Sequence, residues 1–162
     1  MLAQVQQELE SKGHRSFRFL IVGHGAEEGW LRERLPRAEF TGVLKGEALS
    51  RAYANMDLFV FPSHTDTFGN VVLEALASDV PAIVTHDGGP PTIVRDGETG
   101  RIVPDREFAA AAGILGDPAK HAQMREAARA YASTASWDSV FEGAYAGYAT
   151  IQPVRKAEAV AG

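Results

Sequence analysis

The sequence contains no cysteine and no apolar run that approaches the length of a membrane span. Without cysteine the chain has neither a disulfide framework nor a thiolate metal site. Residues 1–16 are polar and lack the apolar core of a signal peptide. We therefore expect a cytoplasmic protein that meets a membrane at most peripherally, at its inner face.

An excess of positive charge is also lacking. Lys and Arg number 16 against 21 Asp and Glu, which gives a net charge of −5 and a pI near 5.5. This balance argues against nucleic acid as a partner. The 162 residues, 45% hydrophobic, are enough for one soluble domain with its own core. We assign residues 1–152 to that domain and the Ala- and charge-rich residues 153–162 to a disordered tail.

Short apolar segments alternate with segments of helical periodicity along the first two thirds of the chain. The segments 17–22, 38–41, 58–61, 82–84 and 101–103 read as strands. Strands that alternate with helices predict right-handed βαβ units, so the fold class is α/β with a Rossmann-like parallel sheet and helices on both faces. Ligands of such sheets bind outside the carboxyl ends of the strands, here the loops 23–25, 42–45, 63–67 and 86–89.

The stretch from residue 58 to residue 82 carries the most chemical information. An apolar strand is followed by a polar loop, and Thr67 is placed to cap a helix. That cap predicts free first-turn N–H groups at the positive helix end, an anion site typical of phosphate, on Phe68, Gly69 and Asn70. Gly69 has no side chain, so a ligand can approach the backbone closely there.

Glu74 makes this anion site more specific. It follows Asn70 by one helical turn and therefore lies on the same face, roughly 6 Å further along the axis. A carboxylate so near a phosphate fits a ligand that also carries a ribose diol, as in dinucleotide sites. The alternative is an ordinary solvated glutamate on a helix surface.

Several short motifs occur together in this stretch. Pro62-Ser63, an acid at Asp66, Phe68-Gly69 and Glu74-Ala75 resemble the signature of glycosyltransferase family 4 (group 1), enzymes of the two-domain GT-B architecture. In that signature two glutamates are separated by seven residues, and Asp66 stands in for the first. The resemblance spans about residues 17–104, and its further matches are Gly23-His24-Gly25, Phe40-Thr41-Gly42, Gly88-Gly89 and Asp96-Gly97-Glu98-Thr99-Gly100.

The resemblance implies the donor-binding domain of a retaining enzyme that transfers a hexose from a UDP- or GDP-sugar to a glycan, lipid or small acceptor. No metal or other cofactor is implied, because the helix dipole and basic side chains neutralise the leaving diphosphate. The implied roles are close backbone approach to the nucleotide for Gly23 and Gly25, contact with the base for Val43 and Leu44, the diphosphate for Thr67, Phe68, Gly69 and Asn70, ribose for Glu74, and the transferred sugar for Asp66.

Other interpretations of these residues stay open. Asp66 is equally suited to capping the helix, and Gly23 and Gly25 to a tight strand-to-helix turn. His24, His64 and His86 fall on the predicted edge, yet their spacing matches no zinc motif, so we predict no metal.

The chain also departs from the family pattern. Asp79 occupies a position where the family usually has glycine, and if that position needs a positive φ, aspartate is among the less costly replacements. The first strand of the family's C-terminal half, with its basic turn, and the N-terminal acceptor domain have no counterpart in the sequence. We therefore expect an isolated chain without transferase activity, with an unpaired sheet position through which another chain can associate. A stand-alone nucleotide-sugar-binding regulatory or scaffold module and a GT-B-like nucleotide-sugar epimerase are the alternatives.

Overall fold

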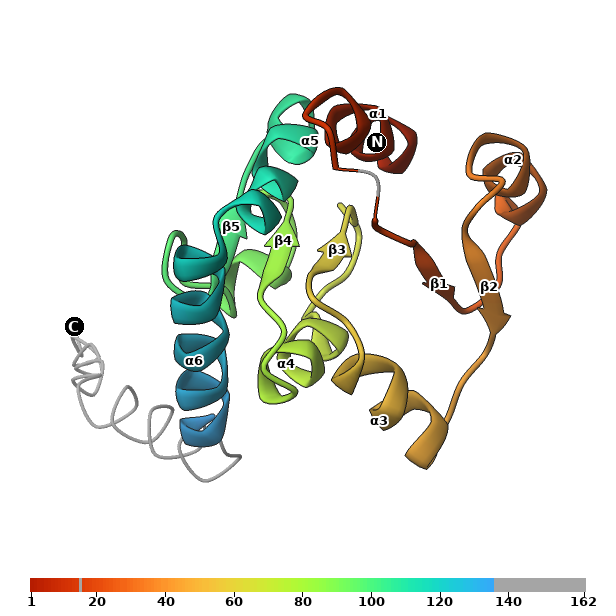
Figure 1. Cartoon of the computed structure of the whole chain (residues 1–162). Coiled ribbons are helices and arrows are strands. Elements are labelled where there is room, and N and C mark those ends of the chain that lie inside the picture. The colour runs from red at the N-terminus through yellow and green to blue at the C-terminus, as the bar shows by residue number, and fades with distance from the viewer. Residues whose placement is uncertain (15, 136–162) are drawn as a thin grey trace, which may run out of the picture. The chain divides into compact units, whose positions relative to one another are not determined.

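A computed structural model describes residues 1–14 and 16–135 (Figure 1). Met1–Ala132 form one compact unit, and Ser133–Gly162 form a second, of which only residues 133–135 are described. The predicted domain end at residue 152 and the predicted tail 153–162 lie outside the described residues.

Five parallel strands alternate with helices, which confirms the predicted α/β class (Figure 1). The strands are β1 (Leu20–Val22), β2 (Glu39–Gly42), β3 (Phe59–Phe61), β4 (Ala82–Val84) and β5 (Gly100–Ile102). The helices are α1 (Leu2–Ser11), α2 (Glu28–Arg34), α3 (Gly46–Ala54), α4 (Asn70–Ala77), α5 (Phe108–Ala111) and α6 (Pro118–Thr134), with short 3-10 turns at Pro90–Thr92, Asp105–Glu107 and Ala112–Gly116.

The five strands lie in two sheets. β1 pairs with β2, whereas β3, β4 and β5 form a second sheet in that order. No ladder joins β1 to β3 in the described chain, so each of these strands keeps one unpaired edge. Phe19, before β1, and Leu58, before β3, nevertheless pack against the same core cluster. The sequence predicts a sheet with one unpaired position, and these two edges are where such a position fits.

The central strand β4 is buried on both faces, as a strand of a doubly covered parallel sheet should be. Successive side chains of a strand point to opposite faces. Ala82 and Val84 accordingly pack with residues of α4 and α6, while Ile83 packs with residues of α1 and α5. Helices therefore cover both faces of this sheet, as predicted.

The turn between α4 and β4 explains the unusual residue at position 79. Asp79 has φ 62°, and it is the one residue other than glycine with a positive φ in the described chain. Its N–H donates to the Leu76 carbonyl at 3.2 Å, and the Val80 N–H donates to the Ala75 carbonyl at 3.0 Å. These two bonds form a Schellman motif, which requires a left-handed residue after the helix. Position 79 therefore does need a positive φ, the condition under which aspartate is one of the less costly replacements for glycine.

Candidate functional site

The loops after β3 and β4 are bound to each other where the strands end. The buried Thr85 hydroxyl donates to the Ser63 carbonyl at 2.6 Å, and the Gly89 N–H donates to the Asp66 carbonyl at 2.9 Å. We call the loops that follow the first four strands, residues 23–25, 42–45, 63–69 and 85–90, the strand-end edge. Within it, the two loops after β3 and β4 form one hydrogen-bonded unit.

Gly89 shows how closely these two loops approach. A Cβ atom at this position would lie 2.2 Å from the Thr67 carbonyl oxygen and 2.7 Å from the Phe68 Cα. Both contacts are with backbone, which cannot swing aside as a flexible side chain can. Only glycine therefore fits at position 89 in this arrangement.

Asp66 organises the start of α4. One of its carboxylate oxygens, Oδ1, accepts the Phe68 N–H at 3.0 Å and the Gly69 N–H at 2.6 Å. Gly69 takes a left-handed conformation, φ 85°, as the N-cap residue, and α4 begins at Asn70. The prediction that Thr67 caps this helix is therefore wrong. The Asp66 carboxylate accepts the N–H groups of Phe68 and Gly69, and the helix begins only after them, at Asn70.

This arrangement changes which N–H groups are free. The predicted phosphate donors were the amides of Phe68, Gly69 and Asn70, and the first two donate to Asp66 instead. Asn70 and Val71 occupy the first helical positions, where no intrahelical carbonyl is available to their N–H groups. The donors at the positive end of α4 are thus shifted one to two residues along the chain.

Glu74 lies on α4 one turn after Asn70, as the sequence predicts, and it is exposed. A residue that sequence reasoning missed lies next to it: Tyr53 of α3 is buried, with only 6% of its surface exposed, and it packs beside Ala75 and Val80. Burial raises the pKa of the Tyr53 hydroxyl, and its hydrogen bond to the Glu74 carboxylate raises it further. Tyr53 therefore stays a neutral donor beside the exposed carboxylate of Glu74.

The other predicted site residues follow the strands of the first sheet. The Gly23 N–H donates to the Gly42 carbonyl at 2.7 Å, which ties together the ends of β1 and β2. Gly25, Val43 and the half-buried Leu44 come directly after these strands. In the described chain no hydrogen bond or ion pair joins these residues to the loop 63–69. Val43 is 57% exposed and Phe68 46%, so two of the large apolar side chains on the surface belong to this edge.

His64 lies between two carboxylates from later loops. Its Nδ1 is 3.0 Å from Asp87 Oδ2, and its Nε2 is 3.2 Å from Asp105 Oδ1. The hydrogen bond to Asp87 raises the pKa of His64, and the charge of Asp105 adds to this. His86 is near the same group, with Nε2 3.6 Å from Asp87 Oδ1. Among residues 1–14 and 16–135, no three acidic, histidine or cysteine side chains are arranged to hold a metal ion.

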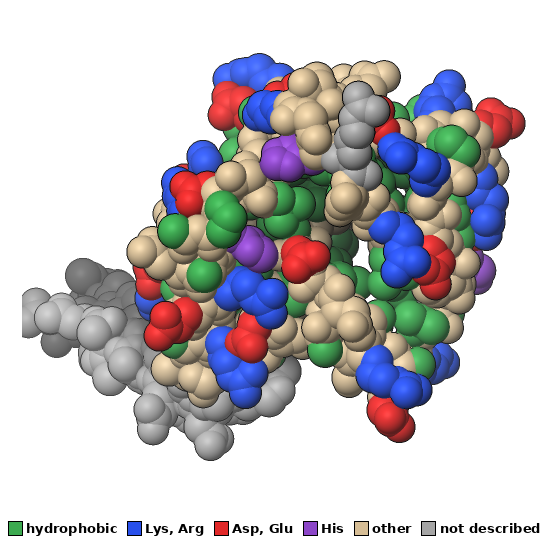
Figure 2. Space-filling model, in the orientation of Figure 1, with side chains coloured by type: hydrophobic (Ala, Val, Ile, Leu, Met, Phe, Trp, Pro, Cys, Tyr) green, Lys and Arg blue, Asp and Glu red, His purple; other side chains and the backbone are tan. Residues whose placement is uncertain are grey.

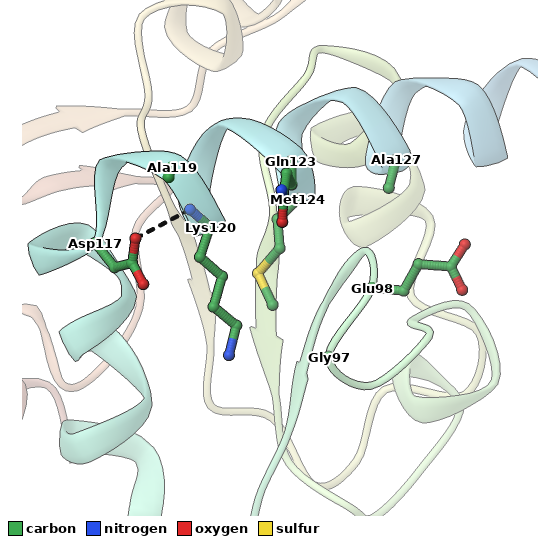
Figure 3. Close-up of a pocket in the computed structure, with 8 residues that line it drawn as sticks. All are labelled: Gly97, Glu98, Asp117, Ala119, Lys120, Gln123, Met124 and Ala127. Carbon is green, nitrogen blue, oxygen red and sulfur yellow. Dashed lines mark hydrogen bonds between the residues drawn. The ribbon is translucent and has the colours of Figure 1, made fainter.

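A shallow hollow lies elsewhere, between α6 and the turn before β5 (Figure 3). In the close-up the Lys120 and Met124 side chains extend from α6, and Asp117 caps the helix by accepting the Lys120 N–H at 3.1 Å. Its lining consists of Gly97, Glu98, Asp117, Ala119, Lys120, Gln123, Met124 and Ala127. Gly97 and Glu98 precede β5, so this hollow belongs to the amino ends of the strands, opposite the strand-end edge.

The surface carries both signs of charge. Figure 2 shows basic and acidic side chains side by side on the visible face, without a broad area of one sign. Many are paired, such as Arg32 with Glu28 at 2.8 Å and Arg101 with Asp96 at 2.9 Å. None of the helices in the described part of the chain combines the length and apolar character needed to cross a bilayer.

Comparisons with known proteins agree on one family. The model of the family described as glycosyl transferases group 1 matches residues 1–116. A GDP-mannose-dependent alpha-mannosyltransferase of Corynebacterium glutamicum is 38% identical over 133 residues, which are 79% of this chain and 32% of that protein. One of the same name from Mycobacterium tuberculosis is 43% identical over 91 residues, 56% of this chain and 24% of that protein. The chain thus spans a third or less of the length of these relatives.

Solved structures show the same fold at lower identity. The pneumococcal O-GlcNAc transferase GtfA in complex with UDP and GlcNAc matches with a TM-score of 0.74 and 21% identity, covering 90% of this chain and 31% of that one. The C-terminal domain of a group 1 family glycosyl transferase (LpcC) from Francisella tularensis matches with a TM-score of 0.69 and 19% identity, covering 82% of this chain and 76% of that one. These identities support a statement about the fold alone.

Proposed function

This chain belongs to the group 1 glycosyl transferases, and from that premise we propose that its strand-end edge binds the nucleotide-sugar donor of a retaining hexosyltransferase. The observation that carries the proposal is the position of Glu74. An exposed carboxylate lies one turn from the start of α4, with the buried Tyr53 as its neighbour on α3. A ribose diol donating to Glu74 would leave the diphosphate at the positive end of the same helix.

The diphosphate would meet the N–H groups at the start of α4. Those of Asn70 and Val71 lack intrahelical partners, and those of Phe68 and Gly69 are shared with Asp66 Oδ1. Gly23, Gly25 and Thr67 would complete the approach of the backbone to the nucleotide, with Val43 and Leu44 beside the base. Helix N–H groups and dipole would stabilise charge on the departing diphosphate without a metal, so EDTA should leave donor binding unchanged.

Asp66 is the proposed acid near the transferred sugar. Its Oδ1 already accepts two N–H groups, whereas Oδ2 has no hydrogen-bond partner in the described chain. A carboxylate whose orientation is fixed by two backbone bonds is well placed to accept from a sugar hydroxyl through its second oxygen. The capping role of Asp66 and its proposed catalytic role are therefore compatible.

The names of the relatives point to a donor to test first. Those from Corynebacterium glutamicum and Mycobacterium tuberculosis are GDP-mannose-dependent, whereas the structural neighbour GtfA was solved with UDP. We propose GDP-mannose as the first candidate and UDP-glucose as the comparison.

The chain spans a third or less of the length of these two relatives, so we also propose that it does not transfer sugar without an acceptor-binding domain. Transfer of hexose to any acceptor by this chain alone would contradict that.

Calorimetric titration of this chain with GDP-mannose and UDP-glucose tests the donor site. We expect one of the two to bind, and Glu74→Ala to weaken that binding about tenfold or more, since a hydrogen bond to a charged group contributes about 1.5–3 kcal/mol. Glu126→Ala is the matched control, because Glu126 is also an exposed helical glutamate but lies on α6. Equal loss in both variants, or no binding by the folded chain, would refute the proposal.

A further inference from the structure

The His64 side chain contacts two loops that lie far from its own loop in the sequence. It lies in the loop after β3, Asp87 lies in the loop after β4, and Asp105 begins the 3-10 turn after β5. Each ring nitrogen faces a different carboxylate, at 3.0 Å and 3.2 Å. In the described chain, the contact of His64 with Asp105 is the one ion pair that links the loop 63–69 to the segment after β5.

The chemistry of imidazole makes this bridge depend on protonation. A neutral imidazole has one N–H donor and one lone pair, whereas the imidazolium has two donors. An ionised carboxylate can accept a hydrogen bond but cannot donate one. A neutral His64 can therefore donate to Asp87 or to Asp105 but not to both. The remaining carboxylate would then face a ring lone pair and be repelled. Only the imidazolium can donate to both carboxylates at once.

The bridge sits directly beside the proposed donor site. His64 precedes Asp66 by two residues, and the Asp66 carbonyl accepts the N–H of Gly89, which follows Asp87 by two residues. Asp66 in turn sets the start of α4 through Phe68 and Gly69. A movement of His64 away from either carboxylate therefore acts on the segment that presents the helix N–H groups.

We propose that His64 is a positioning residue, which as an imidazolium bridges Asp87 and Asp105 and thereby holds the loop 63–69 in the shape that binds a nucleotide sugar, so that binding is tighter at acidic than at alkaline pH. This inference rests on the proposed function of the strand-end edge. It adds a residue and a pH dependence to that site.

The direction of the pH effect follows from the groups around the ring. Asp87 and Asp105 face it directly, and His86 approaches the far oxygen of Asp87 at 3.6 Å. The hydrogen bond to Asp87 raises the pKa of His64 above the ordinary histidine value, with the charge of Asp105 adding to it. Because the pKa of His64 is raised, the bridge is complete when the pH is below the ordinary pKa of histidine. It is lost as the pH rises through the pKa of His64. Nucleotide-sugar affinity should fall over that same interval.

The test is titration of the whole chain with GDP-mannose and with UDP-glucose at about pH 6 and about pH 8. Nucleotide sugars are the right probes because their diphosphate is a diester, whose charge does not change in this range. For the sugar that binds, we expect affinity about fivefold or more tighter at the lower pH, since only the bridged fraction of the chain is competent. His64→Gln should bind equally at both values, with the affinity of the unmodified chain at the higher pH. His14→Gln is the matched control and should keep the pH dependence, because His14 follows α1 and lies outside the strand-end edge.

A second readout needs no ligand. An NMR titration of the His64 ring should give a pKa above the ordinary value, and both Asp87→Asn and Asp105→Asn should lower it. Binding that is independent of pH, a pH dependence that persists in His64→Gln, or a His64 pKa insensitive to both substitutions would overturn this inference alone. A folded chain that binds neither sugar nucleotide at either pH would overturn the proposed function, and this inference with it.

Discussion

At the scale of single residues, Gly89 is the most constrained position of the strand-end edge. Its N–H binds the Asp66 carbonyl, and a methyl group there would meet the backbone of Thr67. We expect Gly89→Ala to lower the free energy of unfolding by about 2 kcal/mol, because the two loops must separate to accommodate the added carbon. Chemical denaturation of the purified chain measures this.

Gly29→Ala is the control for that substitution. Gly29 lies inside α2 and nothing is within 4 Å of its added Cβ, so alanine should stabilise the helix by up to about 1 kcal/mol. If Gly89→Ala were as well tolerated as Gly29→Ala, the close approach of the loops after β3 and β4 would be incorrect.

Residue-level prediction from the sequence succeeds where a signal is local. The place of Glu74 one turn after Asn70 and the capping role considered for Asp66 depend on spacings within one helical turn, and the structure agrees with both. The side chains that contact these site residues could not be predicted in this way. Tyr53 lies on another helix, and Asp87 and Asp105 follow other strands, so only the folded chain brings them to Glu74 and His64. No periodicity or motif in the sequence marks those contacts.

At the scale of elements, α4 is defined by a special residue at each end. Gly69 begins it in a left-handed conformation, and Asp79 ends it in another, with φ 62°. The sequence raises the second as a condition, because the family usually has glycine at this position. The first was not predictable, since Thr67 and Asp66 are both suited to capping the helix, and only the structure shows that Asp66 Oδ1 accepts the N–H groups of Phe68 and Gly69.

Substitutions of Asp79 test the Schellman motif at the end of α4. Asp79→Ala and Asp79→Gly both remove the exposed ion pair with Arg129, whose Nη1 lies 3.2 Å from Asp79 Oδ2. Their difference therefore isolates the backbone. We expect the glycine variant to be more stable than the alanine variant by about 1 kcal/mol, because alanine is strained in the left-handed region. Thermal unfolding of the pair measures it, and an alanine variant as stable as the glycine variant would contradict the motif.

The first strand illustrates a further limit at this scale. The apolar run predicts a strand over residues 17–22, but β1 begins only at Leu20. Phe17 and Phe19 pack against the core cluster beneath α1 and stack edge to face at 5.8 Å. A buried aromatic pair and a β-strand both give an apolar run in the sequence. The run alone therefore does not show where the strand begins.

At the scale of the whole molecule, family and fold class follow from motifs in a fixed order along the chain. The match over residues 1–116 and the parallel strands confirm both. The division into two sheets could not be derived from the order of strands, because strand order leaves open which edges pair. It places Gly23, Gly25, Val43 and Leu44 on loops that no hydrogen bond or ion pair joins to the loop 63–69 in the described chain. We therefore expect a bound nucleotide sugar to bridge the two groups of loops.

The most direct test of the central claim is an amide NMR titration of this chain with GDP-mannose, and with UDP-glucose if the former does not bind. The account predicts that the largest shifts fall on both sets of strand-end loops, on Gly25 and Val43 as well as on Gly69, Asn70 and Glu74. The hollow in Figure 3 is the internal control, and Gly97, Lys120 and Met124 should be unaffected. Shifts confined to that hollow would place the ligand at the opposite ends of the strands and contradict the account.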